Sequence, residues 1–220
     1  MAKTNQQPEE HTPPLRVLIA DDVQETRRST RLMLATIPTV EVVATARDGR
    51  QAVDLTKKHK PDIAIMDVRM PEMDGLTAIR AMLDVHPQMV CIVMSTERDS
   101  QTLRDAMSVG ARAYLIKPYT LEELGQVIQQ AGEVVRSLQQ RTIEAEQLRS
   151  QRDAYLKQLA QEYTNTKRTD DQAIEVFEEL ASNPECELRW MRTLAMIYVI
   201  RQEWDKLVPL AQRLQHRAST

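Results

Sequence analysis

The chain has 220 residues, of which 42% are hydrophobic and 28% are charged, so it can form one or two domains with a buried core. Its net charge is −3, and neither residues 1–118 (16 basic, 16 acidic) nor residues 119–220 (13 basic, 16 acidic) have the basic excess typical of nucleic-acid binding. No apolar run approaches the roughly 20 residues that span a membrane, and the two cysteines lie in separate segments, so we expect a soluble cytoplasmic protein without disulfides.

Residues 1–14 are polar and rich in proline, which predicts a disordered arm and not a signal peptide. From residue 15 onward, short apolar runs alternate with amphipathic segments that have helical spacing. This alternation predicts an α/β fold, a doubly wound parallel sheet with helices on both faces. The runs expected to form its five strands are LRVLIA (15–20), VEVVATA (40–46), DIAIMD (62–67), MVCIVMS (89–95) and RAYLIK (112–117).

Polar side chains follow four of these runs. Asp21 and Asp22 follow the first, Asp67 ends the third, Ser95 ends the fourth, and Lys117 ends the fifth. The carboxyl ends of these strands meet at one edge of a doubly wound sheet, so we expect the side chains to share a cleft. Three carboxylates without a cation would repel one another, and Mg²⁺ prefers oxygen ligands of this kind. For Asp67 alone, a turn-capping role is the alternative.

Residues 15–135 resemble the response-regulator receiver domain of two-component signalling. The resemblance rests on four separated motifs in the family's order. These motifs are Asp21-Asp22, Asp67 with Met-Pro-x-Met-Asp-Gly after it, Ser95-Thr96 and Lys117-Pro118. The resemblance implies a flavodoxin-like sheet with strand order 2-1-3-4-5. It also implies a protein phosphorylated by a sensor histidine kinase, with self-catalysed phosphorylation and dephosphorylation as its only chemistry.

Position by position, the resemblance makes Asp67 the phosphoacceptor and Lys117 the phosphate-binding lysine. It places Mg²⁺ on Asp21 and Asp22, on Asp67, and on the backbone carbonyl of Arg69. The chemistry agrees, because a carboxylate that attacks a phosphoryl group must overcome the repulsion between two anions. Mg²⁺ and Lys117 would supply the neutralising positive charge.

The resemblance also implies a switch and a backbone feature. Ser95 corresponds to the switch hydroxyl, and Tyr114 corresponds to the aromatic switch residue. A cis peptide bond is expected between Lys117 and Pro118. Arg69 and Glu97 flank the site as possible modulators: they either form an ion pair that slows hydrolysis of the acyl phosphate, or remain two solvated charges with little effect.

After Pro118 the pattern becomes wholly helical. Thr120-Leu-Glu-Glu123 matches a capping box, and a four–three spacing then continues for about five heptads. We therefore expect a long helix over 120–162 that pairs with its copy in a parallel homodimer. The alternative is an amphipathic helix on its own domain, which so long a helix would overshoot. The seam positions are Val127, Ala131, Val134, Leu138, Arg141, Ala145, Leu148, Arg152, Tyr155, Leu159 and Glu162.

Residues 163–217 are expected to form helical hairpins with a faint internal repeat. Leu159-Ala160-x-x-Tyr163 recurs as Leu194-Ala195-x-x-Tyr198. The period resembles that of tetratricopeptide repeats, but Gln202 stands where that pattern has a glycine. A repeat and a generic helical hairpin therefore both remain open.

The sequence leaves three hypotheses to compare for the function of the whole chain. The leading hypothesis is a phosphorylation switch whose helical extension binds a downstream protein. A transcription regulator that binds DNA through the C-terminal helices is the alternative, although those helices are acidic and lack an obvious recognition helix. A phosphatase resembling the haloacid dehalogenase family would need a second Asp two positions after Asp67, where this chain has Arg69.

Overall fold

The computed structural model describes residues 13–97 and 100–218, so all but the last two residues of the expected arm over 1–14 lie outside the described residues. The chain divides into two compact units, one extending to Arg141 and the other starting at Thr142. Among the helices of the described residues, none is long and apolar enough to cross a membrane.

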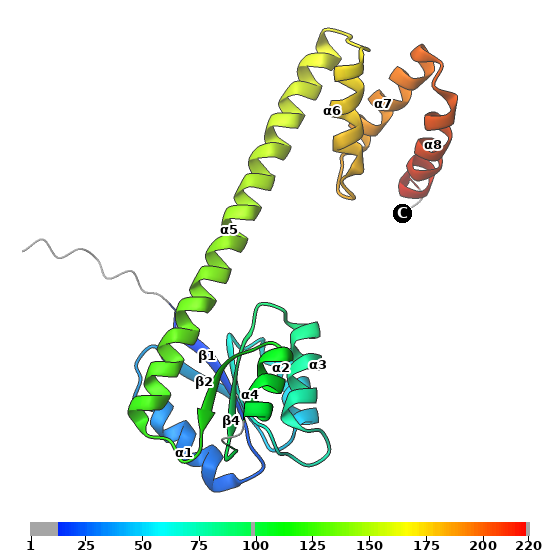
Figure 1. Ribbon diagram of the computed structural model, residues 1–220. Coiled ribbons are helices and arrows are strands. Elements are labelled where there is room, and N and C mark those ends of the chain that lie inside the picture. Colours follow the sequence, from blue (N-terminus) through cyan, green and yellow to red (C-terminus); the bar gives the residue numbers. More distant parts are fainter. Residues whose placement is uncertain (1–12, 98–99, 219–220) are drawn as a thin grey trace, which may run out of the picture. The chain divides into compact units, whose positions relative to one another are not determined.

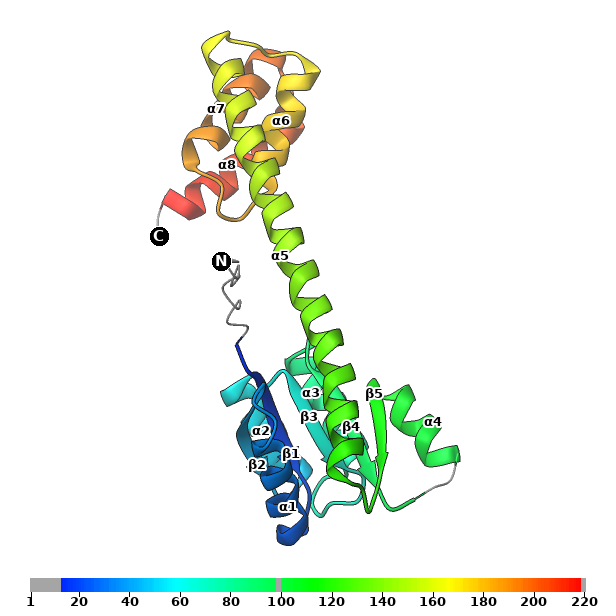
Figure 2. The same cartoon turned by 90° about the vertical axis from the view of Figure 1, so that its left-hand side faces the viewer.

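The first unit contains a five-stranded parallel sheet with the order β2-β1-β3-β4-β5, which confirms the predicted fold class and strand order (Figure 1 and Figure 2). The central strand β3 and its neighbour β4 are buried at every position, as expected for strands covered on both faces. The predicted runs agree with the strands to within one residue at each end. The strands are β1 (Leu15–Ala20), β2 (Val40–Ala46), β3 (Ile63–Asp67), β4 (Val90–Ser95) and β5 (Ala111–Ile116).

Helices cover both faces of this sheet. Residues of α2, α3 and α4 form one core with one set of strand side chains, and α1 with the first turns of α5 forms a second core with the other set (Figure 1). Each core is almost wholly aliphatic, so burial of apolar area supplies its main stabilisation. The helices are α1 (Gln24–Ala35), α2 (Gly49–His59), α3 (Gly75–Val85), α4 (Ser100–Ser108) and α5 (Leu121–Asn165).

The strand register brings the predicted polar residues to one edge of the sheet. Asp67 is paired with Met94, and Ser95, the next residue of β4, is paired with Ile116. The backbone N–H of Lys117 then donates to the carbonyl of Ser95 over 2.8 Å, which continues the ladder beyond β5. Parallel pairing in this register therefore places Asp67, Ser95 and Lys117 at the carboxyl ends of adjacent strands.

Helix α5 begins at the predicted capping box. The backbone N–H of Thr120 donates to the Glu123 carboxylate over 2.8 Å, and the N–H of Glu123 donates to the Thr120 hydroxyl over 3.2 Å. These reciprocal bonds satisfy two donors that a helix start leaves without partners. The helix continues to Asn165, three residues beyond the expected end.

The apolar seam of α5 is not one free stripe, which differs from the expectation. Its first four positions pack against the sheet of the first unit, and Leu159 packs in the second unit. Between them, Leu148 is 68% exposed and Tyr155 is 61% exposed. The physical reason is that a four–three spacing produces an apolar face that can bury against the chain's own core as readily as against a second helix. The four positions that pack against the sheet are Val127, Ala131, Val134 and Leu138.

The second unit consists of the end of α5 with three further helices around one core. Helices α6 and α7 pack together, as do α7 and α8. The repeated positions Ala160 and Tyr163 lie in this core together with Leu194 and Tyr198, an arrangement that suits either of the two interpretations of the repeat. The helices are α6 (Asp171–Ser182), α7 (Leu188–Arg201) and α8 (Trp204–Ala218).

Gln202 ends α7 in the left-handed conformation, with φ 60° and ψ 31°. Glycine adopts this conformation at little cost, whereas a residue with a Cβ is strained there. The position where the repeat pattern has glycine therefore keeps the backbone conformation that favours glycine but carries a glutamine instead.

We predict that Phe177→Ala destabilises the helical unit by about 3–5 kcal/mol, because it removes a fully buried ring and leaves a cavity. The ring centroids of Phe177 and Trp190 are 6.2 Å apart. Both tryptophans of the chain, Trp190 and Trp204, lie in this unit, so urea unfolding followed by tryptophan fluorescence reports on it. Val208→Ala, at a side chain that is 58% exposed, is the matched control. Equal urea midpoints for the two variants would contradict the prediction.

Candidate functional site

Asp67 is the last residue of the buried strand β3, and its side chain is almost completely buried. One carboxylate oxygen, Oδ2, accepts a hydrogen bond of 2.9 Å from the backbone N–H of Arg69. The following loop returns so closely that a Cβ on Gly75 would lie 1.9 Å from the Asp67 carbonyl oxygen. Only glycine fits there without moving the backbone that carries Asp67.

The Lys117 ammonium lies between two carboxylates. Its Nζ donates to Oδ2 of Asp21 and to Oδ1 of Asp67. Asp21 is fully buried, and its other oxygen, Oδ1, accepts a bond of 2.8 Å from the N–H of Val23. Three of the residues predicted from the strand ends therefore meet, while Asp22 lies beside them as an exposed residue.

Burial and charge act against each other at this site. Burial raises the pKa of Asp67 above its ordinary value, even though the hydrogen bond from Lys117 and its charge favour the carboxylate. For Lys117, burial lowers the pKa, but the bonds to Asp21 and Asp67 outweigh it and the net direction is upward. The ammonium is therefore stable, whereas the Asp67 carboxylate still gains from further positive charge.

The side chains here suit Mg²⁺ in chemistry but are not gathered as a metal cage. Within residues 13–97 and 100–218, no three carboxylate, imidazole or thiol groups are clustered as a metal site. Lys117 instead occupies the space between Asp21 and Asp67. The available donors are carboxylate and carbonyl oxygens, the hard ligands that Mg²⁺ takes, usually with several of its waters. A single ammonium also leaves part of the charge of three carboxylates unbalanced, so the residues fit this ion.

Ser95 and Tyr114 are connected through the backbone of Glu97. The Ser95 hydroxyl is buried and accepts a bond of 3.0 Å from the N–H of Glu97. The Tyr114 hydroxyl donates to the carbonyl of the same residue over 2.7 Å. The two predicted switch residues thus hold one loop residue from both sides, a link that the sequence pattern did not indicate.

The side chain of Glu97 joins two further segments. It forms an ion pair with Arg69, as one of the two interpretations of these residues supposed. Its other oxygen accepts a bond of 2.6 Å from the hydroxyl of Thr102 in α4. Arg69 is largely exposed in this pair, whereas Glu97 is partly buried. Glu97 therefore connects the loop after Asp67 with the loop after Ser95 and with α4.

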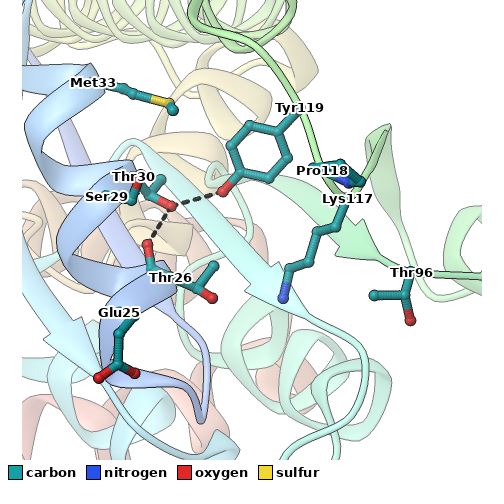
Figure 3. Close-up of a pocket in the computed structure, with 9 residues that line it drawn as sticks. All are labelled: Glu25, Thr26, Ser29, Thr30, Met33, Thr96, Lys117, Pro118 and Tyr119. Carbon is teal, nitrogen blue, oxygen red and sulfur yellow. Dashed lines mark hydrogen bonds between the residues drawn. The ribbon is translucent and has the colours of Figure 1, made fainter.

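A cavity of about 470 Å³ opens beside Lys117, between α1 and the segment 117–119 (Figure 3). Tyr119 lines this cavity, and its hydroxyl shares a hydrogen bond of 2.7 Å with the hydroxyl of Thr30 in α1. Burial is the main reason that the pKa of Tyr119 is raised. Sequence reasoning missed this contact; the only available signal was an aromatic residue directly after Lys117-Pro118. The peptide bond between Lys117 and Pro118 is cis, which confirms that prediction.

Comparison with known proteins agrees with this geometry. Residues 17–129 match the family described as the response regulator receiver domain. The chain is 35% identical over 125 residues to a protein-glutamate methylesterase/protein-glutamine glutaminase of Methanococcoides burtonii, which is 56% of this chain and 36% of that protein. It is 34% identical over 121 residues to the transcriptional regulatory protein DegU of Brevibacillus brevis, which is 54% of this chain and 51% of that protein.

A solved structure gives the same result. The CheX-CheY-BeF3-Mg complex from Borrelia burgdorferi matches with a TM-score of 0.51 and 28% identity, over 54% of this chain and 89% of that chain. The aligned part spans about a third to a half of the length of the two curated relatives, so the likeness concerns the receiver region. The chain belongs to the response regulator receiver domain family, with the receiver at residues 17–129 and a helical C-terminal region after it.

Proposed function

We propose that this protein is a phosphorylation-dependent response regulator in which Asp67 accepts a phosphoryl group from a sensor histidine kinase. The observation that carries the proposal is the contact between the Lys117 ammonium and the Asp67 carboxylate at the carboxyl edge of the sheet. A lysine in this position supplies positive charge where phosphoryl oxygens would lie. A cavity lined by Lys117 and Thr96 lies next to this edge, although Asp67 itself does not line it.

In the proposed step, an oxygen of the Asp67 carboxylate forms a bond to the phosphorus of a phosphohistidine. The phosphorus–nitrogen bond breaks, and its electron pair returns to the imidazole of the kinase. Both reacting groups are anionic, so positioning and positive charge provide most of the catalysis. Lys117 supplies this charge from within the chain, and the bond from the Arg69 N–H holds the second Asp67 oxygen.

Mg²⁺ would be held by the carboxylates of Asp21, Asp22 and Asp67 and by the backbone carbonyl of Arg69. When bound, it supplies further positive charge at the phosphoryl oxygens. The raised pKa of Asp67 supports this assignment, because an additional cation favours the ionised nucleophile. The relative from Borrelia burgdorferi is described as a complex with Mg²⁺ and BeF3.

The product would change the contacts of Glu97. An aspartyl phosphate adds up to two negative charges and three acceptor oxygens beside Ser95. The Ser95 hydroxyl can donate to one of these oxygens, which weakens its contact with the Glu97 N–H. Tyr114 and Thr102 both bind Glu97, so a shift of this residue would reposition the Tyr114 ring and α4.

The output is assigned to protein contacts of the C-terminal helices. The acidic balance of residues 119–220 supports a protein partner more than DNA. DNA binding is kept as the second candidate because one relative, DegU, is named a transcriptional regulatory protein. That likeness covers 54% of this chain, and the matching receiver family spans residues 17–129, which end before α6 begins.

The middle of α5 is assigned to a parallel homodimer contact. Leu148 and Tyr155 are one heptad apart, and both are largely exposed. Neither side chain is part of the core of the helical unit. Pairing of two α5 helices would bury both side chains in a short coiled coil.

We predict that Asp67→Asn abolishes labelling by a small-molecule phosphodonor such as phosphoramidate in the presence of Mg²⁺, because an amide cannot act as the nucleophile. Chelation of Mg²⁺ should also abolish labelling of the unaltered protein. Asp84→Asn, at an exposed carboxylate on α3, is the matched control and should be labelled normally. Comparable labelling of Asp67→Asn would refute the assignment.

We predict that Arg69→Ala and Glu97→Gln each shorten the lifetime of the aspartyl phosphate, because the ion pair screens the entrance from water. The effect should be at most about five-fold, since exposed ion pairs contribute about 1 kcal/mol or less. The double variant should decay no faster than either single variant if both act through the pair. Arg80→Ala serves as the control, and decay unchanged in all variants would mean that the pair does not protect the phosphate.

We predict that Leu148→Asp converts the dimer to a monomer, because it places a carboxylate in the seam. Leu138 is unsuitable for this test because it packs against the receiver core. Ser150→Asp adds the same charge on the opposite side of the helix and should leave the dimer intact. Light scattering of both variants provides the measurement. A monomeric mass for the unaltered protein, with and without a phosphoryl mimic, would contradict the dimer.

A further inference from the structure

An apolar groove lies within the helical unit, between the end of α5 and helix α7. We call it the α5–α7 groove; it has a volume of about 330 Å³. Two of its side chains are large, apolar and mostly in contact with solvent, Met196 at 66% exposure and Ile200 at 62%. Adjacent apolar residues with this exposure are typical of interaction sites. The groove is lined by Tyr163, Lys167 and Arg168 on one side and by Thr193, Met196 and Ile200 on the other.

The charge around the groove is mainly positive. Helix α7 contains three arginines and no acidic residue. Lys167 lines the groove, and Arg192 lies one turn before Met196 on the same helix. Neither Lys167 nor Arg192 has an ion-pair partner within the described residues. Two unpaired cations beside an exposed apolar surface are complementary to a ligand that is apolar on one face and acidic at its edges.

The neighbouring acidic side chains do not cancel this charge. Asp170 pairs with Arg168 over 2.7 Å, and Asp171 pairs with Arg201 over 2.7 Å. Arg168 is further fixed by stacking over the Tyr163 ring, 4.3 Å from its centroid. Glu162 is the exception: it is exposed, and its charge acts on Arg168. It should therefore weaken the binding of an acidic ligand.

We propose that the α5–α7 groove binds an acidic amphipathic helix of a partner protein, with apolar side chains seated on Met196 and Ile200 and carboxylates facing Lys167 and Arg192. This proposal rests on the proposed function, in which the helical unit is the output of the switch. Met196 and Ile200 are spaced as neighbours on one helix face, so they form a ridge suited to a second helix. The groove is bordered by α5, α7 and the loop of residues 167–169, and no strand lies in the described part of this unit, which favours a helix in a groove over an added strand.

The test uses two stapled helical peptides of 18 residues with the same Leu and Met face, one with Glu at the flanking positions and one with Lys. Each is labelled with fluorescein and titrated with the full-length protein while anisotropy is recorded. We expect saturable binding of the Glu peptide, at least ten-fold tighter than that of the Lys peptide and weakened by salt. Equal affinities, or no binding of the Glu peptide, would overturn the proposal.

Variants locate the binding site. Met196→Glu should lower the affinity for the Glu peptide several-fold or more, and so should the double variant Lys167→Gln with Arg192→Gln. Glu162→Gln should raise this affinity. Val208→Glu places the same charge at an equally exposed apolar position on α8 and should have no effect. If Met196→Glu binds the Glu peptide with the affinity of the unaltered protein, the groove is not the binding site. If Met196→Glu converts a dimer to a monomer, the groove binds a second copy of this chain, and the proposal of a partner helix is rejected.

The same samples separate this proposal from the proposed function. Phosphoramidate labelling of Asp67 should be identical in the unaltered protein and in Met196→Glu, because the substitution lies in the other unit. Absence of labelling in the unaltered protein would refute the receiver function whatever the peptides do. Normal labelling without a Glu-peptide preference would refute only the groove.

Discussion

The Lys117 ammonium is held between the carboxylates of Asp21 and Asp67, and the order of this sheet edge depends on that contact. Two buried carboxylates at neighbouring strand ends would repel each other, so a cation between them makes their burial tolerable. The contact also connects β1, β3 and the segment after β5, three parts of the chain distant in sequence. Because burial still raises the pKa of Asp67, further positive charge would stabilise its carboxylate, which is consistent with the proposed phosphoacceptor role and with the proposed Mg²⁺.

Glu97 extends this site toward the helices. Its backbone binds Ser95 and Tyr114, and its carboxylate binds Arg69 and Thr102. Hydrogen bonds therefore connect Ser95, at the strand end next to Asp67, with Tyr114 and with Thr102 of α4 through the single residue Glu97.

Helix α5 distributes one apolar pattern among three environments. Its first turns complete the core on one face of the sheet, its last turns complete the core of the helical unit, and its middle remains exposed. Burial at both ends stabilises the helix without any partner chain. Only the exposed middle, around Leu148 and Tyr155, is therefore available for pairing with a second copy. The α5–α7 groove is a separate surface, distinguished by its positive charge.

The sequence by itself determined the receiver fold and the identity of its polar edge. Strand periods, strand-end residues and the four motifs are local signals, and parallel pairing brings strand ends together whatever the details of packing. It also determined the capping box at Thr120, which depends on residues close together in the chain. The cis bond at Lys117-Pro118 was expected from the family resemblance.

Tertiary structure decided the remaining features because they depend on contacts between distant segments. The placement of Lys117 between Asp21 and Asp67, the junction at Glu97 and the bond from Tyr119 to Thr30 join residues far apart in the chain. The sequence also did not determine which surface buries the apolar positions of α5. A four–three spacing indicates that one face of a helix is apolar, but it does not indicate what covers that face. Which neighbour buries each turn follows only from where the two cores end along the helix.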